Sequence, residues 1–510
     1  MNKGTSVRSV RILAIVFLLA ALGFAPQAGA ATRTWTGAAV DANWSMAANW
    51  GGTAPVAGDD LVFPAGAARL INNNDFAAST SFNTISFTGA GGGYVLGGNA
   101  IQLVAGITAS NTASNNSVAL PITLGASQAF SCSTPVLSGR LYIAGTIALG
   151  AFTLTLGSFP GLIEVQNAAV ISGTGGVVAA GNLGLDSNCT YSGPTTVTGL
   201  VSFGGNSLNP ASAVSVNSGE LQLSNGASIG SLTVTAAGSL GLFGGGISSA
   251  GSVTSASMAS GSNMILGMNS LTNYGQLNSS GAVDITGVNA TITWFFTSSS
   301  GNTFTIINKT GAGAVTGTFS GLAEGATFTG NGRTYKITYV GGDGNDVVLT
   351  DVTPFPPALT KSFGSGLISP NDTTSLTFVA TNPNPATGLS GVGFTDTLPA
   401  GLVVATPNGL SSTCGGSTTA IAGSGTVTLS GGSIAASGSC TIVVNVTAST
   451  VGSFVNTTST VSSTEGDAGA AASATIDVAE KIPTLGGWGL LALAALLGVA
   501  ALLVLRRSSA

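Results

Sequence analysis

Short runs in which apolar and small polar residues alternate recur from residue 31 to residue 480 and limit the possible folds more than any other feature. Examples are FTLTLGSF, SLTVTAAGSLGLF and GTVTLSGGS. A period of two places every second side chain on the same face of a strand. No sustained helical period with capping residues occurs in this stretch. We therefore expect the body of the chain to be all-β.

The composition excludes several classes of protein. Charged residues make up 6% of the chain, against about 25% in an ordinary soluble domain, so a basic nucleic-acid surface is not expected. The 44% of hydrophobic residues argues against disorder. The chain has no histidine, which excludes Ser-His-Asp triads and histidine metal sites. We expect no cofactor.

Residues 31–351 form the first predicted domain, in which short strand-like runs are separated by turns of small residues. This texture predicts a solenoid in which each coil buries its inner face against the next coil. Coils of about 20 residues would give about 15 coils. Only six charged residues lie between Ile101 and Ser320, as an apolar interior requires.

One stretch of this domain, Ile171 to Phe203, carries a T-Y-x-G-x-T-x-V pattern. It resembles the autotransporter-associated β-strand repeat, and the resemblance implies a right-handed parallel β-helix. The residues that match the pattern are Tyr191, Gly193, Thr195 and Val197.

Three tryptophans, Trp35, Trp44 and Trp50, lie at the start of the solenoid domain. We expect them to form a cap, because the first coil needs bulky side chains to close an otherwise open core. The alternative is that their rings are exposed and stack on sugars.

The C-terminal segment, residues 481–510, differs in character from the rest. No side chain from Trp488 to Leu505 is charged, and as a helix this run would be roughly 27 Å long, close to the thickness of a bilayer core. Arg506 and Arg507 end the run and are expected to stay cytoplasmic. We predict a transmembrane helix over residues 488–505.

The motif before this run, IPTLGGWG, resembles the I-P-T-L-x-x-W-G sorting signals (IPTL-CTERM) of Gram-negative envelope proteins. The resemblance implies that the tail is held in the inner membrane and cut by an exosortase, a membrane-embedded transpeptidase, which would be a partner of this chain. A plain membrane anchor is the alternative. The recognition residues would be Ile482, Pro483, Thr484, Leu485, Trp488, Gly489, Arg506 and Arg507.

The N-terminus, residues 1–30, has the pattern of a signal peptide. Basic residues precede the apolar run Ile12–Ala25, and Ala28 and Ala30 form a small-residue site for signal peptidase. The pattern predicts export by the Sec machinery to the cell surface or the medium of a Gram-negative bacterium.

A second domain is predicted over residues 352–480, after a proline-rich hinge. Its regular turns favour a β-sandwich of about seven strands. It resembles the immunoglobulin-like (DUF11-like) repeat of unknown function in bacterial surface proteins, which serves as a spacer or stalk. The matching residues are Asn382, Pro383, Phe394, Asp396, Leu398, Pro399, Gly401 and Leu402.

The chain has four cysteines, and export would place them in an oxidising compartment, where disulfides form. Cys414 and Cys440 fall at matching positions of the immunoglobulin-like family, and the resemblance implies a disulfide between them. Cys132 and Cys189 lie nearly three coils apart if coils take about 20 residues, and whether they pair is left open.

The segment GGDGNDVVL, Gly341 to Leu349, fits one copy of the nonapeptide of calcium-binding β-rolls. Asp343 and Asp346 are its candidate ligands. Calcium needs consecutive copies, so a tight turn is the preferred interpretation and no metal site is expected.

These features favour a non-enzymatic surface protein with a structural or adhesive role, whose partners include extracellular glycans or other surface molecules. The carboxylates of the solenoid are scattered singly along the sequence. Two other functions stay open, namely a polysaccharide-active β-helix enzyme with two converging carboxylates and a calcium-dependent binding module.

Overall fold

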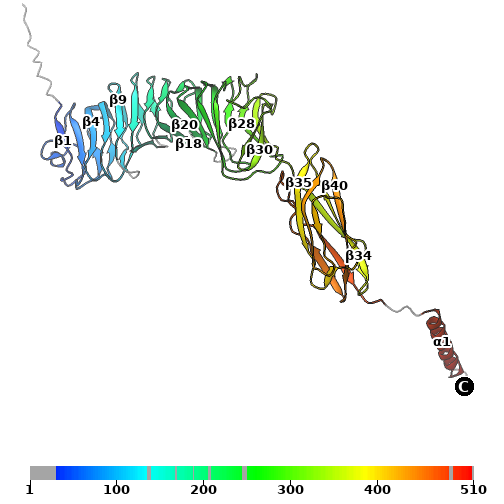
Figure 1. The fold of residues 1–510 in the computed structure, drawn as a ribbon. Helices are drawn as coiled ribbons and strands as arrows, with labels where there is room; N and C mark the ends of the chain where they lie inside the picture. The colour runs from blue at the N-terminus through cyan, green and yellow to red at the C-terminus, as the bar shows by residue number, and fades with distance from the viewer. Residues whose placement is uncertain are drawn as a thin grey trace, which may run out of the picture. The chain divides into compact units, whose positions relative to one another are not determined.

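The computed structural model describes residues 30–134, 139–166, 169–187, 189–204, 208–224, 226–243, 250–481 and 486–507. Ala28 of the signal-peptidase site and Ile482, Pro483, Thr484 and Leu485 of the sorting motif lie outside the described residues. The chain is nearly all β, as the alternation predicts, and it divides into two compact units (Figure 1).

The first unit is a β-solenoid that contains an 11-stranded sheet. All described pairs in this sheet are parallel, for example Leu141 with Ile163 and Leu183 with Val201. Its strands are β3 (Ile71–Asn74), β5 (Val95–Gly98), β7 (Asn116–Val118), β10 (Arg140–Ile143), β13 (Leu162–Val165), β16 (Leu183–Leu185), β18 (Leu200–Gly204), β20 (Gly219–Ser224), β22 (Gly238–Phe243), β24 (Asn263–Met268) and β27 (Asn289–Trp294).

A 20-stranded sheet supplies the other strands of the coils. It comprises β1 (Thr32–Thr34), β2 (Asp60–Pro64), β4 (Thr80–Thr88), β6 (Ile101–Ala109), β8 (Ile122–Leu124), β9 (Gln128–Cys132), β11 (Ile147–Ala148), β12 (Leu154–Ser158), β14 (Ile171–Ser172), β15 (Val177–Ala179), β17 (Thr195–Val197), β19 (Val214–Val216), β21 (Ser228–Val234), β23 (Gly251–Met258), β25 (Leu277–Ser279), β26 (Val283–Asp284), β28 (Thr303–Lys309), β29 (Thr327–Gly330), β30 (Arg333–Gly341) and β31 (Asp346–Asp351).

The core of the solenoid consists of columns of buried side chains that repeat from coil to coil. Parallel register stacks each residue on its counterpart in the next coil, so one apolar residue in each coil extends the column. Each fully buried Val, Leu or Ile contributes about 1.5–3 kcal/mol. One column of the 20-stranded sheet consists of Phe130, Leu156, Ala179, Val197, Val216, Val234 and Met258.

The expectation of about 15 coils is wrong, because the solenoid has about 10 turns. The spacing between neighbouring coils varies, because one hydrogen bond joins residues 18 apart, Thr235 and Asn217, and another joins residues 30 apart, Asn308 and Asn278. The turns between strands are therefore longer in many coils than a regular 20-residue repeat allows.

The second unit is built mainly on antiparallel strands after residue 350, with one parallel pair, β33 with β42, and these strands pack around one apolar core. One sheet has the order β32-β34-β40-β36 with β37 paired to β40, and the others are β33-β42-β41 and β35-β39-β38. The strands are β32 (Ala358–Phe363), β33 (Leu367–Ile368), β34 (Thr373–Thr381), β35 (Leu389–Thr397), β36 (Leu402–Val404), β37 (Ser411–Ser412), β38 (Ser417–Thr419), β39 (Thr426–Ile434), β40 (Ser439–Ala448), β41 (Gly452–Thr457) and β42 (Ser473–Val478).

This unit also includes residues 298–302 and 328–336, which precede the predicted boundary at residue 351. Arg333 explains the grouping, because its buried guanidinium forms ion pairs with Asp351 and with Asp467 of the sandwich. Burial opposes ionisation of Asp351, but bonds from Arg333, Ser298 and Thr353 outweigh burial and lower the pKa of Asp351.

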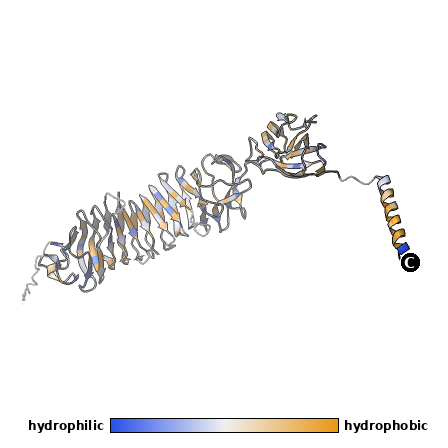
Figure 2. Cartoon of the chain, turned by 90° about the horizontal axis from the view of Figure 1, so that it is seen from below, coloured by the Kyte–Doolittle hydropathy of each residue, from blue (hydrophilic) through white to orange (hydrophobic). Residues whose placement is uncertain are grey.

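The chain ends in helix α1 (Gly487–Arg507), which is 21 residues long with a mean hydropathy of 2.6. It is long and apolar enough to cross a membrane. None of its residues is buried against the protein. Figure 2 shows the helix as apolar along its length and hydrophilic at its C-terminal end, where Arg506 and Arg507 lie.

Candidate functional site

The described residues of the sorting motif are exposed. Trp488 and Gly489 lie in the first turn of α1, and the Trp488 side chain is 87% exposed. Ala30 of the signal-peptidase site is exposed directly before the first strand of the solenoid. These residues are accessible to another protein, and their recognition by an exosortase or signal peptidase stays a prediction.

The N-terminal tryptophans are buried, which agrees with a cap and not with sugar stacking. Trp35 and Trp44 are fully buried and pack edge-to-face on Trp50, with ring centroids 5.1 and 6.1 Å apart. The indole N–H of Trp35 donates to Arg69 O at 2.7 Å, and that of Trp44 donates to Asn72 Oδ1 at 2.7 Å. Every indole N–H of the three finds an acceptor, because Trp50 donates to Trp44 O.

The residues of the repeat-like pattern are also buried. Tyr191 is fully buried, and its hydroxyl shares a 2.6 Å hydrogen bond with Thr195 Oγ1. Burial raises the pKa of Tyr191, so this hydroxyl stays protonated. The pattern therefore encodes the solenoid interior.

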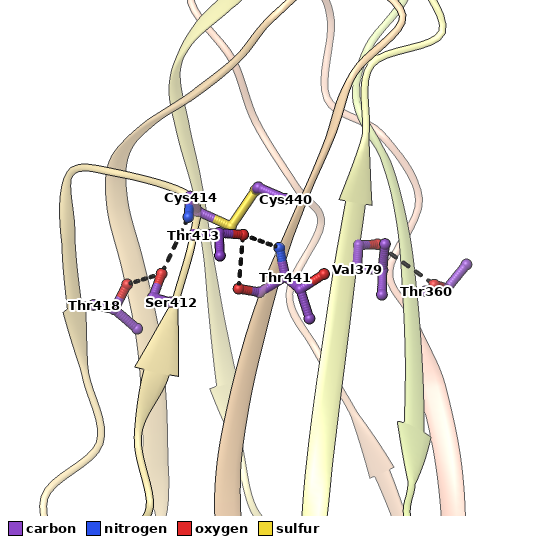
Figure 3. Close-up of a disulfide and its surroundings, with 8 residues drawn as sticks. All are labelled: Thr360, Val379, Ser412, Thr413, Cys414, Thr418, Cys440 and Thr441. Atoms are coloured by element: carbon purple, nitrogen blue, oxygen red, sulfur yellow. Dashed lines mark hydrogen bonds between the residues drawn. A yellow bond between two sulfur atoms is a disulfide. The ribbon is translucent and has the colours of Figure 1, made fainter.

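Cys414 and Cys440 form a disulfide with Cα atoms 4.8 Å apart, as the family resemblance implies. The bond joins β40 to the loop after β37, and hydrogen bonds flank it, including Thr441 N–H to Thr413 Oγ1 at 2.9 Å (Figure 3). Cys132 and Cys189 are free, buried thiols, so they do not pair. The Cys132 sulfur contacts Thr134, and the Cys189 sulfur contacts Ser187.

Of the calcium candidates, Asp343 lies in the turn between β30 and β31, whereas Asp346 is the first residue of β31. Asp343 is exposed, whereas Asp346 Oδ1 accepts a hydrogen bond from the backbone N–H of Lys309 at 2.8 Å. Across the described residues, no group of three acidic or thiol side chains forms a metal-binding cluster. The geometry is that of a tight turn that Asp346 ties to β28.

The solenoid brings two carboxylates together that are far apart in the sequence. A methyl group added at Gly184 would lie 3.5 Å from Glu164 Cγ and 3.9 Å from Asp186 Oδ2, so both acids flank this glycine. Burial, and then the charge of Glu164, raise the pKa of Asp186. Arg140 pairs with Glu164 at 3.0 Å. The two carboxylates are single in the sequence and do not share a strand, but they approach each other because β13 and β16 are neighbours in the parallel sheet.

Two hollows open over these strands. A hollow of about 210 Å³ is lined by Glu164, Asp186, Ser202 and Gln222 among others. A hollow of about 680 Å³ shares Asn182 and Leu200 with it. Its other lining residues include Glu220 and Phe159, a residue that is 82% exposed.

The sandwich contains a buried polar cluster that the sequence analysis missed. Lys361 Nζ on β32 lies 2.5 Å from Asp396 Oδ1 on β35, and both side chains are 0% exposed. Asn456 on β41 donates from Nδ2 to Asp396 Oδ2 at 2.9 Å. The sequence carries a signal for this cluster. Each of the three polar residues lies two positions from an apolar residue of the same strand, namely Leu359, Phe394 or Phe454. Because side chains two apart on a strand share a face, the polar residues are expected to face the core as well.

Comparison with known proteins identifies one domain. Residues 357–478 match the family model described as Domain of unknown function (DUF7933). No curated protein matches this chain.

Among solved structures, the bacterial hydrophobin BslA matches at 17% identity over 25% of this chain and 98% of that chain, with a TM-score of 0.20. The collagen adhesin of S. aureus matches at 11% identity over 30% of this chain and 76% of that chain, with a TM-score of 0.18. The tailspike protein 4 domain of bacteriophage CBA120 matches at 11% identity over 78% of this chain and 63% of that domain, with a TM-score of 0.24.

Proposed function

We propose that this chain is an exported surface protein with a structural or adhesive role, in which a solenoid and a sandwich domain are tethered through α1. The single observation that carries the proposal is α1 itself, because it is a 21-residue apolar helix, long enough to cross a membrane, and none of its residues is buried. A lipid bilayer supplies the apolar surroundings that such a helix needs.

We propose further that the tail is an exosortase substrate and that its retention in the inner membrane is transient. The I-P-T-L-x-x-W-G motif directly before and within the start of α1 supports this step. A plain anchor requires apolarity and length but none of the motif's identities. The two possibilities therefore respond differently to substitutions that keep the helix apolar.

The experiment compares three chains in a Gram-negative host that carries an exosortase: the native chain, Pro483→Ala and Leu491→Ala. Mass spectrometry of the envelope and medium fractions measures the C-terminus of each chain. A sorting signal predicts a C-terminus near the motif for the native and Leu491→Ala chains and an uncut tail for Pro483→Ala. An intact Arg506–Arg507 end in all three chains would contradict processing and leave a plain anchor.

A second candidate function is an interaction of the solenoid with polysaccharide, either binding or cleavage. The observation that favours it is the pair Glu164 and Asp186 in one hollow, together with the exposed Phe159 in the second hollow, which shares Asn182 and Leu200 with the first. Glycoside hydrolysis needs two carboxyl groups about 5 to 10 Å apart, one of them with a raised pKa. An aromatic ring and neighbouring amides suit the apolar faces and hydroxyls of sugars.

Binding and cleavage are separated by two variants tested on soluble polysaccharides. Asp186→Asn should abolish cleavage but keep binding, whereas Phe159→Ala should weaken both. If the native chain neither retains nor shortens any polysaccharide of a broad panel, this second function is wrong and the structural role remains.

A further inference from the structure

The polar cluster of the sandwich brings an amine, a carboxyl group and a carboxamide together in an apolar interior. Lys361, Asp396 and Asn456 come from three different sheets, and their side chains meet only because the sheets close around a common core. Asp396 is in contact with both of the others, through Oδ1 to Lys361 Nζ and through Oδ2 to Asn456 Nδ2. The amine and the carboxamide are thus held on the two oxygens of one carboxyl group.

We propose that Lys361 and Asn456 react with each other to form an intramolecular isopeptide bond, with Asp396 as the group that transfers the protons. The reaction needs no cofactor, metal or external oxidant. It converts two side chains of the folded domain into one covalent cross-link and releases ammonia.

A proton passes from the Lys361 ammonium to Asp396, which leaves a neutral amine whose lone pair attacks Cγ of Asn456. The Nζ–Cγ bond forms while the Cγ–Nδ2 bond breaks. Asp396 gives its proton to Nδ2 and takes a proton from Nζ, so that ammonia leaves and the carboxyl group is regenerated. The products are a secondary amide between Lys361 and Asn456 and one molecule of ammonia.

The surroundings favour the neutral form of the amine that this step requires. Lys361 Nζ lies 5.4 Å from the centre of the Phe378 ring, and Phe378 packs against Phe394. Burial lowers the pKa of Lys361, although Asp396 opposes the shift. Moving one proton within the pair replaces two buried charges by two neutral groups, which lowers the cost of desolvation.

The carboxamide is also prepared for attack. Asn456 Oδ1 is buried without a hydrogen-bond partner while Nδ2 donates to Asp396. An unpaired buried oxygen is costly. A rotation of the Asn456 amide group by half a turn places its oxygen next to Asp396. The protonated Asp396 then donates a hydrogen bond to this oxygen, which polarises the carbonyl for attack by the amine.

Asp396 is the less suitable electrophile. If Lys361 bonded to Asp396 instead, the proton-transfer group would be consumed. Within the described part of the chain, no second carboxyl group forms a hydrogen bond with Lys361 or Asn456 and could replace it. The geometry therefore assigns Asn456 as the electrophile.

The bond would have a mechanical consequence that rests on the proposed function. In a chain tethered through its C-terminal helix, tension would enter the sandwich before β32 and leave after β42. A link between Lys361 on β32 and Asn456 on β41 would carry this tension directly from one strand to the other. The segment between the two residues, which contains the Cys414–Cys440 disulfide, would then bear no tension.

The test is the intact mass of the full chain after reduction of the disulfide, followed by tandem mass spectrometry of proteolytic fragments. The proposal predicts a mass lower than that of the sequence by one ammonia for each molecule, and a branched fragment that joins Lys361 to Asn456. A full mass in the folded native protein would overturn the proposal. A loss of water with a Lys361–Asp396 fragment would overturn the assignment of Asn456.

Three variants and a control make the test specific. Lys361→Arg and Asp396→Asn should keep the full mass, whereas Asn456→Asp should lose water in place of ammonia. Lys481→Arg, at an exposed lysine outside the cluster, should lose ammonia as the native chain does. The native measurement stands even where a variant fails to fold. Because it needs neither export nor tethering, its outcome is independent of the proposed surface role.

Discussion

Lys361 Nζ and Asp396 Oδ1 lie 2.5 Å apart in the interior of the sandwich, and neither side chain is exposed to solvent. A buried ion pair is weak evidence for stability, because its desolvation often costs as much as its attraction returns. Stability alone therefore does not explain why the pair is buried. The contact of Asp396 with Asn456 offers an explanation, the proposed reaction between Lys361 and Asn456.

Removing one member of this pair should be strongly destabilising. Lys361→Met leaves the Asp396 charge buried without a cation, and we expect a loss of about 3–5 kcal/mol in the free energy of unfolding. The double variant Lys361→Met/Asp396→Leu should be more stable than Lys361→Met, because no unpaired charge remains, but less stable than the native chain, because both variants lack the proposed link to Asn456. Urea unfolding of the three chains measures both effects, and equal stability of the two variants would contradict this account.

The disulfide should stabilise the sandwich by about 3 to 4 kcal/mol, given that it closes a loop of 26 residues. The variant Cys414→Ser/Cys440→Ser should lose this amount in urea unfolding. Adding dithiothreitol should destabilise the native chain but have no further effect on the variant. Thiol counting should find two free thiols, Cys132 and Cys189, that react only after unfolding.

Acid should weaken the second unit through Asp351. Its pKa in the folded state lies below the ordinary value of 3.8, so its contribution to stability is present above pH 3.8 and is lost as the pH falls through the folded pKa. Asp351→Asn should therefore lower stability at neutral pH but leave it almost unchanged at the acid end. Asp477→Asn, at an exposed carboxylate, is the control and should follow the native curve.

For Asp186, we expect stability to depend on pH in the direction opposite to that for Asp351. Its raised pKa means that the folded protein is penalised for ionising this group, so the cost appears as the pH rises above the unfolded pKa. Asp186→Asn should stabilise the solenoid at neutral pH, and the gain should vanish at low pH. Thermal melts of both chains at several pH values measure this difference in stability. A variant that is less stable than the native chain at neutral pH would show that ionisation of Asp186 does not destabilise the fold.

The tryptophan cap should be essential to the first coils. Trp44→Ala removes a fully buried ring that packs on Trp50, Phe63 and Phe82, and we expect a loss of about 3–5 kcal/mol. Phe159→Ala removes an aromatic ring of which 82% is exposed and should change stability little. Hydrogen exchange of the first coils reports where the cap acts.

The alternation of the sequence was sufficient to predict an all-β body, because a period of two is a local property of each strand. The apolar run before Arg506 and Arg507 predicted the single long helix for the same reason, and the structure extends it by one residue at its start and two at its end. The sequence also shows that Lys361 takes a position where the alternation calls for an apolar residue. It does not show which residues Lys361 contacts.

Only the tertiary structure decided which residues meet. Asp396 lies 35 residues after Lys361, and Asn456 lies 60 residues after Asp396. Glu164 comes near Asp186 only because the register of β13 on β16 pairs Glu164 with Gly184. Register depends on turn lengths and on the packing of whole sheets, which no short segment encodes. The sequence by itself determined the kind of elements and the chemistry available along them, whereas strand pairing decided where that chemistry converges.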